Sequence, residues 1–498
     1  MIGIIEEGGN DIYKWTFFFY KHFYFSITRL KMLFYYIRTF FIGIITIYGV
    51  AALPPYEHDI NHLRQHLATK TPYIADPKPQ VDTIGEKYRV LQFQMVSRHG
   101  TRYPSKGDCR DIAKLIPHLQ TSKNKKAVGW LATYKNVYPE RRGKELDING
   151  MREMYDYGYR MSRSHPNLLD EILDEDVFLY YSSLASWSQR TSQSAIAFQR
   201  GLFEDYQNNN NNDANLLDID VKVDGHPVHG SSSSSSSGGR MQLVAPIQTL
   251  FFENGTKVAQ ADICKRWKEQ VEENPTTMTE ADKYKARYIG PIAARMTQEL
   301  GIPMTVDDVE AVYAGCQFDI THQHRVDTFC TLLAPEDISI LEYHQDLESY
   351  YKYSYGSELN TKLACPLIQD IMKNMANAVN GTEDYTRMDL KFLHSESVFL
   401  TASFLGLFKD EKILSADWNQ QQIDERKFRC SKISPFGGNV VFQLLGDKKR
   451  GNNKYVRVLV SEKAVVVPGC PGEICPYQTF KNLYQEKLQC SFEQLCNN

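Results

Sequence analysis

The chain has 498 residues, enough for one large domain or two with an ample hydrophobic core. Its formal net charge is only −3, which excludes a global field that would demand nucleic acid or an anionic membrane as a partner. Ten cysteines are scattered along it without the ligand spacing of a zinc site, so they favour disulfides in an oxidising compartment over a metal centre.

Residues 1–53 have the pattern of a secretory leader. An uncharged apolar run at 39–52 follows three basic residues and ends in small residues before a proline pair. The run is short for a membrane span, so it predicts a cleaved signal peptide and a protein that is secreted or held in the endoplasmic reticulum lumen. An uncleaved signal anchor stays open, and only in that case do we expect contact with a membrane.

A polar, proline-punctuated stretch at 54–87 is expected to form an irregular arm on the surface. It is followed by an apolar run within 88–96, which is typical of a strand buried on both faces of a mostly parallel sheet. This strand leads into a basic turn, Arg98-His99-Gly100-Thr101-Arg102, at its carboxyl end, where ligands gather in such sheets. Gly100 allows the backbone to bend sharply and to approach a ligand closely.

The basic turn suits a phosphate group. Arg98 and Arg102 each offer a planar fork of donors that matches the oxygens of a tetrahedral dianion. The neutral imidazole of His99 between them is a competent nucleophile, provided that a hydrogen bond to one nitrogen fixes the tautomer. The sequence therefore predicts phosphoryl chemistry at His99.

A second site segment follows a helical stretch at 111–170. A short buried strand is predicted at 176–183 and a helix at 186–203, with Arg190 at the junction between them. This is again the carboxyl end of a strand, and the helix N-terminus adds partial positive charge there.

The third site segment lies in the last quarter of the chain. After low-complexity loops at 206–240, to which we assign no function, residues 241–384 are expected to be largely helical. A strand beginning at Met388 then ends in His394-Ser395-Glu396, and paired strands are predicted at 437–445 and 454–467.

Arg98 to Pro104, RHGTRYP, resembles the signature of the histidine phosphatase superfamily in its acid phosphatase and phytase branch. Arg190 matches that family's R-T-x-x-S-A context, and residues 146–153, LDINGMRE, resemble its L-T-x-x-G-x-x-E segment with Asn149 near a helix start. The tyrosine-rich stretch at 341–367 is similar to multiple inositol polyphosphate phosphatases.

The resemblance implies a role for each site residue. His99 becomes transiently phosphorylated; Arg98, Arg102, Arg190 and His394 hold the phosphoryl oxygens; and Glu396 donates the proton to the leaving group. Ser395 stands where the inositol polyphosphate branch has alanine, and its hydroxyl could perturb the neighbouring glutamate. No metal and no cofactor are expected, because cationic side chains supply the electrostatic stabilisation. The implied partner is a small phosphorylated molecule, phytate or another inositol polyphosphate, with bisphosphoglycerate as a further candidate.

The implied fold class is α/β, with a mostly parallel sheet core flanked by helices and an inserted, largely helical cap. Each of the three site segments follows a predicted strand, and helix-rich stretches separate them. This alternation supports the architecture independently. The expected division of the chain is a leader at 1–53, α/β core at 54–110, a helical segment at 111–170, core at 171–205, loops at 206–240, the helical cap at 241–384, and core with C-terminal strands at 385–498.

Three disulfides are candidates. Cys109 with Cys430 would tie the two ends of the core, while Cys316 with Cys330 and Cys470 with Cys475 are local pairs. Asn254 and Asn380 are candidate glycosylation acceptors.

Two other functions stay open. The first is a broad acid phosphatase that acts on small monoesters, and comparing phytate with glycerol phosphate would separate it from the main hypothesis. The second is an inactive, membrane-anchored protein that binds polyanions. The sequence does not indicate an oligomeric state.

Overall fold

A computed structural model describes residues 56–75, 84–175, 180–204, 221–223, 226–227, 247–250, 261–382, 385–449 and 451–497. The predicted leader at 1–53, the polar tracts at 208–212 and 231–239, and the glycosylation acceptor Asn254 lie outside these residues. Asn380 lies within them, exposed at the end of a helix, and its glycosylation stays a prediction.

A mixed sheet forms the core. Its strands are β1 (Tyr88–Arg98), β2 (Tyr181–Ser186), β3 (Val221–Val223), β4 (His226–Pro227), β5 (Ile247–Leu250), β6 (Met388–Leu393), β7 (Asn439–Asp447), β8 (Lys454–Val460), β9 (Lys463–Val465) and β10 (Ile474–Pro476). Their order is β10-β8-β7-β1-β6-β2-β5-β3-β4, with β9 beside β8. The strands from β1 to β3 in this order are parallel, whereas β7, β8 and β10 continue the sheet in antiparallel fashion. The predicted α/β class with a mostly parallel core is confirmed, and the strands predicted near 437–445 and 454–467 do pair.

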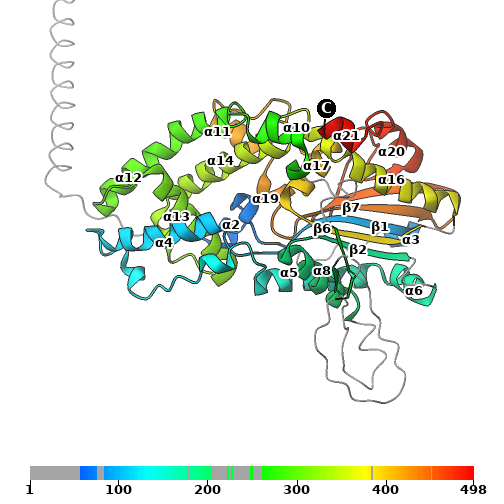
Figure 1. The fold of residues 1–498 in the computed structure, drawn as a ribbon, viewed down its shortest axis with the longest axis horizontal. Coiled ribbons are helices and arrows are strands. Elements are labelled where there is room, and N and C mark those ends of the chain that lie inside the picture. The colour runs from blue at the N-terminus through cyan, green and yellow to red at the C-terminus, as the bar shows by residue number, and fades with distance from the viewer. Residues whose placement is uncertain are drawn as a thin grey trace, which may run out of the picture. The chain divides into compact units, whose positions relative to one another are not determined.

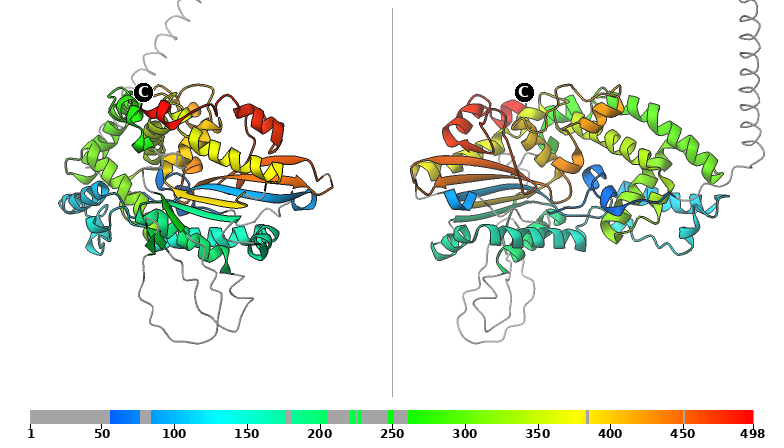
Figure 2. Two further views of the ribbon diagram at one scale, coloured as in Figure 1. Left: turned by 45° about the vertical axis from the view of Figure 1, so that its right-hand side comes forward. Right: turned by 180° about the vertical axis from the view of Figure 1, so that it is seen from behind.

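Helices cover both faces of the sheet (Figures 1 and 2). One face carries α5 (Ile148–Ser164), α6 (Pro166–Glu175) and α8 (Gln189–Leu202), and the other carries α16 (Cys365–Asn380), α17 (Ser395–Phe404) and α20 (Tyr477–Tyr484). Helices α5 and α8 approach so closely that a Cβ atom on Gly158 or Gly201 would collide with the facing backbone. Both glycines are therefore needed for this packing.

A helical region lies beside the sheet (Figure 1). Its longer helices are α4 (Lys106–Gln120), α11 (Thr279–Tyr284), α12 (Gly290–Leu300), α13 (Val306–Phe318) and α14 (Pro335–Tyr353). The shorter helices of the described chain, which are not confined to this region, are α2 (Ile60–Leu63), α3 (Ile84–Lys87), α10 (Lys265–Trp267), α15 (Asn360–Leu363), α18 (Gln420–Glu425), α19 (Cys430–Ile433) and α21 (Phe492–Cys496). Helix α4, which follows the basic turn directly, packs on α13 and shares one apolar cluster with it. None of the described helices is both long and apolar enough to cross a membrane.

The stretch at 56–75 corrects the expectation of a surface arm. Leu63, at the end of α2, and Leu67, just beyond it, are both buried in the apolar cluster of the helical region. Gln317 on α13 donates to the carbonyl of Leu67 at 2.9 Å. This stretch therefore passes between the helical region and the end of β1, where it contributes to the site.

Strand β2 begins later than predicted. It starts at Tyr181, and residues 176–179, where the predicted strand began, lie outside the described part of the chain. The helix after it starts at Gln189, so the junction that carries Arg190 is as expected.

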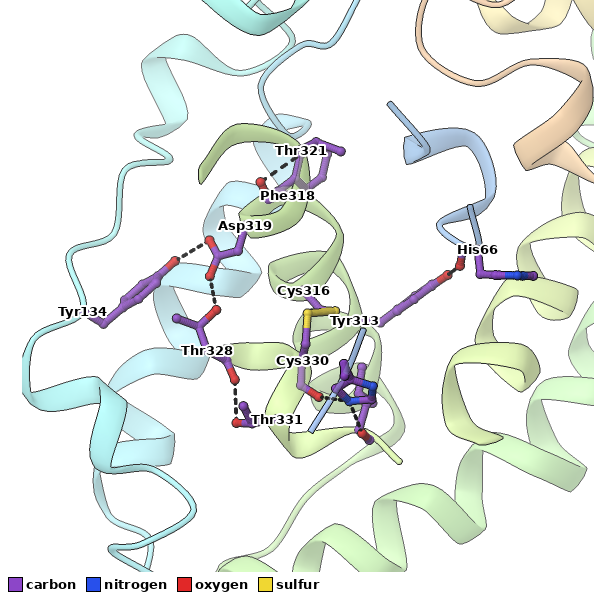
Figure 3. Close-up of a disulfide and its surroundings, with 12 residues drawn as sticks. His66, Tyr134, Tyr313, Cys316, Phe318, Asp319, Thr321, Thr328, Cys330 and Thr331 are labelled. Atoms are coloured by element: carbon purple, nitrogen blue, oxygen red, sulfur yellow. Dashed lines mark hydrogen bonds between the residues drawn. A yellow bond between two sulfur atoms is a disulfide. The ribbon is translucent and has the colours of Figure 1, made fainter. Parts of the chain in front are cut away.

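Four disulfides join cysteines of the described chain: Cys264–Cys496, Cys316–Cys330, Cys365–Cys490 and Cys470–Cys475. The two local pairs are those expected from the sequence, and Figure 3 shows the Cys316–Cys330 bond with its surroundings. The predicted bridge between Cys109 and Cys430 is wrong, because both are free, buried thiols. Cys109 lies on α4 in the apolar cluster of the helical region, whereas Cys430 begins α19 in a different cluster that includes β7 and β8.

Candidate active site

The three predicted site segments meet at one edge of the sheet. Strands β1, β6 and β2 are parallel neighbours, so their carboxyl ends lie side by side. Strand β1 ends at Arg98, which pairs with Leu393 at the end of β6, and β2 ends at Ser186. The basic turn, His394 and the start of α8 therefore leave the sheet together, as the pattern of strand-ended motifs predicted.

The basic turn is held against α5 and α8. Gly100 lies against Gly150 so closely that a Cβ on either would collide with the other segment's backbone. The Gly100 amide donates to the Ser194 hydroxyl on α8 at 3.1 Å. Gly150 and Ser194, the small residues of the two sequence patterns, thus allow α5 and α8 to pack directly against the turn.

His99 has the properties of a nucleophile. Its Nδ1 lies 2.8 Å from the carbonyl oxygen of Gly100, which can only accept, so Nδ1 carries the proton and Nε2 keeps a free lone pair. Burial lowers the pKa of His99 well below its usual range, and the charges of Arg98 and Arg190 lower it further. The ring is therefore neutral with its tautomer fixed, as a nucleophilic imidazole requires.

Three arginines surround this imidazole. Arg98 is 2 % exposed; its Nη1 donates to the carbonyls of Thr69 at 2.5 Å and Ser434 at 2.8 Å, and its guanidinium lies 4.4 Å from the ring centre of Phe436. Arg102 donates to the carbonyl of Tyr103 at 2.6 Å. Arg190 enters from the first turn of α8.

The charges of these arginines are not neutralised by ion pairs. Among the described residues, no carboxylate forms a salt bridge with Arg98, Arg102 or Arg190. Burial lowers the pKa of Arg98 to about 9, and the positive charge of Arg102 is the second cause of this decrease. Burial likewise lowers the pKa of Arg102 to about 10, and the charge of Arg190 contributes next. Three guanidiniums that repel one another at one point form a site for a multiply charged anion.

His394 orients Arg190. Its Nδ1 lies 3.2 Å from Nη2 of Arg190, an obligatory donor, so Nδ1 accepts and the proton resides on Nε2. Nε2 donates to the Ser186 hydroxyl at 3.0 Å, and that hydroxyl contacts Oγ1 of Thr191 at 3.0 Å. Burial and then Arg190 lower the pKa of His394 well below its usual range, so the ring is neutral. Ser186 and Thr191 were not singled out from the sequence, although Thr191 belongs to the R-T-x-x-S-A pattern.

Glu396 lies in the first turn of α17, two residues beyond His394. Burial raises the pKa of Glu396 to about 7, and Asp262 raises it, while its own backbone amide and Arg190 act in the opposite direction. The carboxyl group is therefore mostly protonated in mildly acidic solution, beside the arginines, where it can give a proton to a leaving oxygen.

Glu153 is a supporting residue that sequence reasoning did not assign to the site. Its carboxylate accepts from the Thr101 amide and hydroxyl, both at 2.8 Å, and from the Tyr73 amide at 3.3 Å. Burial raises the pKa of Glu153 to about 7, although the bonds from Thr101 lower it. The signal was present in the glutamate of LDINGMRE, three residues after the glycine that contacts the turn.

Two lysines also lie near the arginines. Burial lowers the pKa of Lys70; Asp108 counteracts this, and the charges of Arg102 and Arg98 lower it further. Burial lowers the pKa of Lys144 too, followed by Arg102 and Arg190. Neither ammonium forms a salt bridge with a carboxylate of the described chain. No sequence pattern identified them, because only the tertiary structure brings 56–75 and the loop before α5 to the turn.

Comparison with known proteins gives a consistent result. The model of the histidine phosphatase superfamily (branch 2) matches residues 89–461. The chain is 27% identical over 448 residues to multiple inositol polyphosphate phosphatase 1 of Gallus gallus, covering 86% of this chain and 89% of that protein. It is 24% identical over 431 residues to the Homo sapiens protein of that name, covering 82% and 81%.

Solved structures share the fold. A phytase from D. castellii superimposes with a TM-score of 0.66 at 18% identity, covering 88% of each chain. Multiple inositol polyphosphate phosphatase of Bifidobacterium longum, in complex with inositol hexasulfate, gives a TM-score of 0.64 at 15% identity, covering 83% of this chain and 96% of that one. At these identities the match concerns the architecture alone.

Proposed function

The chain belongs to branch 2 of the histidine phosphatase superfamily, and on that premise we propose that it hydrolyses inositol polyphosphates through a phosphohistidine. The observation that carries the proposal is a buried imidazole with a free Nε2, surrounded by three arginines without carboxylate partners among the described residues. The substrate class is supported by relatives named multiple inositol polyphosphate phosphatase and phytase, and by the Bifidobacterium longum relative seen with inositol hexasulfate.

In the first step, Nε2 of His99 attacks phosphorus in line with the ester oxygen. An N–P bond forms while the P–O bond to the inositol oxygen breaks, and Glu396 gives its proton to that oxygen. Arg98, Arg102 and Arg190 hold the equatorial oxygens and stabilise their charge, so the proposed chemistry needs no metal ion.

In the second step, water attacks the phosphohistidine. The Glu396 carboxylate takes a proton from the water as the new O–P bond forms, and the N–P bond breaks to return the electron pair to Nε2. Inorganic phosphate leaves and the site regains its starting protonation. His394 acts chiefly by holding Arg190, because direct donation to phosphate would require a proton on its Nδ1.

Lys70 and Lys144 favour a polyphosphate over a simple monoester. Both are cations whose pKa values are lowered by burial and by the arginines that hold the scissile phosphate. Phosphates at other ring positions would lie beyond the arginines, where these two ammonium groups can pair with them. A small monoester has no group to use them.

The test is phosphate release from phytate at about pH 5 with a chelator present, wild type beside His99→Ala, with glycerol phosphate assayed in parallel. We expect release by the wild type, at least tenfold preference for phytate in kcat/KM, and loss of both activities in the variant. Equal turnover of the two substrates would favour a broad acid phosphatase instead. A folded wild type that binds phosphate but releases none would favour the polyanion-binding protein.

The four disulfides fit a protein of the secretory pathway. We propose more narrowly that the protein is secreted or resides in the endoplasmic reticulum lumen after removal of the leader. An N-terminal sequence of the mature protein beginning near Ala52 would support cleavage, whereas retention of the apolar run would support the anchor.

A further inference from the structure

His322 connects the helical region to the phosphate-binding turn. It lies in a π-helical turn, Asp319–Gln323, that continues α13, and its side chain is 5 % exposed. Its Nε2 lies 3.0 Å from the carbonyl oxygen of Arg102, and its Nδ1 lies 3.4 Å from Oδ2 of Asp147. Both partners can only accept, so the ring satisfies both when each nitrogen carries a proton.

Asp147 supports the neighbouring residue of the same turn. Its backbone amide donates to the carbonyl of Thr101 at 2.9 Å, and its carboxylate caps α5 by accepting from the Asn149 amide at 3.2 Å. Burial alone would raise the pKa of Asp147, but the contacts with His322 bring it below its usual range. Asp147 and His322 therefore hold two successive carbonyls, those of Thr101 and Arg102.

The segment that carries His322 is itself fixed. The Cys316–Cys330 disulfide closes the loop around it, and Asp319 accepts from Tyr134 at 3.1 Å and from Thr328 at 2.6 Å (Figure 3). Asn149 on α5 donates to the carbonyls of Thr321 and His322, both at 3.1 Å. The imidazole thus has little freedom to follow the turn if the turn moves.

We propose that His322, paired with Asp147, is a positioning residue that fixes the backbone of Arg102 and so aims its guanidinium at the phosphate. The proposal rests on the proposed function, and it assigns a role in phosphate binding to a helix outside the three site segments. A displacement of about 1 Å at such a group is enough to cost roughly a hundredfold in rate.

Asp147 holds the ring in the orientation that the Arg102 carbonyl needs. The ring also packs against the phenol rings of Tyr103 and Tyr138, with ring centroids 4.8 and 5.6 Å away. Loss of the Asp147 carboxylate removes one of the two polar contacts of the ring, so its effect on Arg102 should be smaller than that of losing the imidazole.

The experiment uses the full chain with His322→Gln and Asp147→Asn, and His324→Gln as the matched control. His324 is exposed two residues along the same segment, and asparagine keeps the oxygen that caps α5. Phosphate affinity is measured from the rise in Tm that inorganic phosphate produces, and kcat/KM for phytate is measured at about pH 5, each relative to the wild type, with Tm in the absence of phosphate as a check on folding.

We expect His322→Gln to lose about 10- to 100-fold in kcat/KM and to bind phosphate about tenfold more weakly, with its Tm in the absence of phosphate close to that of the wild type. Asp147→Asn should bind phosphate about threefold more weakly, and His324→Gln should match the wild type. Wild-type phosphate affinity in His322→Gln, or a smaller loss there than in Asp147→Asn, overturns the proposal. Should His322→Gln fail to fold, wild-type phosphate affinity in Asp147→Asn overturns it instead.

Phosphate binding separates this inference from the proposed function. If the wild type binds phosphate but does not hydrolyse phytate, the proposed function is wrong, while weaker phosphate binding by the variants still supports the role of His322. If the wild type hydrolyses phytate and the variants bind phosphate normally, the function stands and the positioning role is rejected.

Discussion

The protein buries arginines in two places, and their surroundings are opposite. Arg426 is enclosed between two carboxylates, with its Nη2 3.2 Å from Glu342 and 2.6 Å from Asp346. Burial alone would lower the pKa of Arg426, but these carboxylates raise it above its usual range. Arg98, equally buried, donates to carbonyls, and its pKa falls to about 9.

The difference separates structure from function. A buried guanidinium that is paired with carboxylates contributes to a fixed architecture, and breaking such a pair leaves an uncompensated charge. A buried guanidinium without a carboxylate is electrostatically unfavourable until an anion binds. The paired cluster, Arg426 with its two carboxylates, joins α14, α18 and α19. The unpaired cluster, Arg98, Arg102 and Arg190, lies at the carboxyl ends of β1, β2 and β6.

The largest expected effect separates binding from chemistry within the unpaired cluster. His99→Ala removes the nucleophile and leaves the arginines in place, so turnover should fall about 10⁴-fold or more. Inorganic phosphate should still raise Tm, since a ligand at about 100 times its Kd stabilises by about 2.7 kcal/mol. A variant that has lost the phosphate-dependent Tm shift would show that His99, rather than the arginines, dominates binding.

Glu396 tests whether the unpaired cluster can acquire a counter-charge. Its raised pKa, about 7, means that the carboxyl is protonated below that pH and ionised above it. Because the donor must be protonated, kcat/KM should fall as pH rises through about 7, and phosphate should bind more weakly there since the carboxylate partly neutralises the arginines.

Glu396→Gln should lower kcat by about 10²- to 10⁴-fold and should flatten phosphate affinity across this range. Glu411→Gln is a suitable control, since it changes an exposed carboxylate that is not among the groups that shift the pKa of Glu396. An unchanged pH profile in Glu396→Gln would assign the alkaline limb to another group.

Matching substitutions in the two arginine clusters test the comparison directly. Arg426→Met leaves Asp346 buried without an ion-pair partner among the described residues, so the free energy of unfolding should fall by about 3–5 kcal/mol. Arg98→Met removes an unpaired charge and some hydrogen bonds, so stability should change by no more than about 1 kcal/mol while kcat/KM falls about 10²- to 10³-fold.

Denaturant unfolding and kinetics on the same preparations measure both quantities. Equal losses in the free energy of unfolding for Arg426→Met and Arg98→Met would show that the carboxylate partners do not make Arg426 more important for stability than Arg98.

The smallest expected effect concerns Lys70, an ammonium at the edge of the unpaired cluster. Lys70→Met should lower kcat/KM for phytate by about 5- to 10-fold and leave glycerol phosphate within about twofold, because one charge-assisted contact contributes about 1–1.5 kcal/mol. Lys114, exposed on α4 and close to Asp111, provides a control through Lys114→Met. An equal loss on both substrates would place Lys70 with the groups that hold the scissile phosphate.

The sequence alone determined the local parts of the site. The strand, turn and helix that carry Arg98, His99 and Arg102 are contiguous, as are His394 and Glu396, so short-range patterns were sufficient to identify them and the α/β class. Arg190 was assigned to the site by its resemblance to the family's R-T-x-x-S-A motif, and the strand-to-helix junction on which it lies is present in the structure, although the strand starts later than predicted.

Only the tertiary structure decided which distant groups surround these motifs. Residues far away in sequence, Thr69, Lys70 and His322, lie close to the turn, and no local periodicity indicates this proximity. The expected Cys109–Cys430 bridge is absent because burial of apolar faces places the two thiols in different clusters. Local patterns fix the conformation of a segment, whereas its neighbours depend on how all the buried faces pack together.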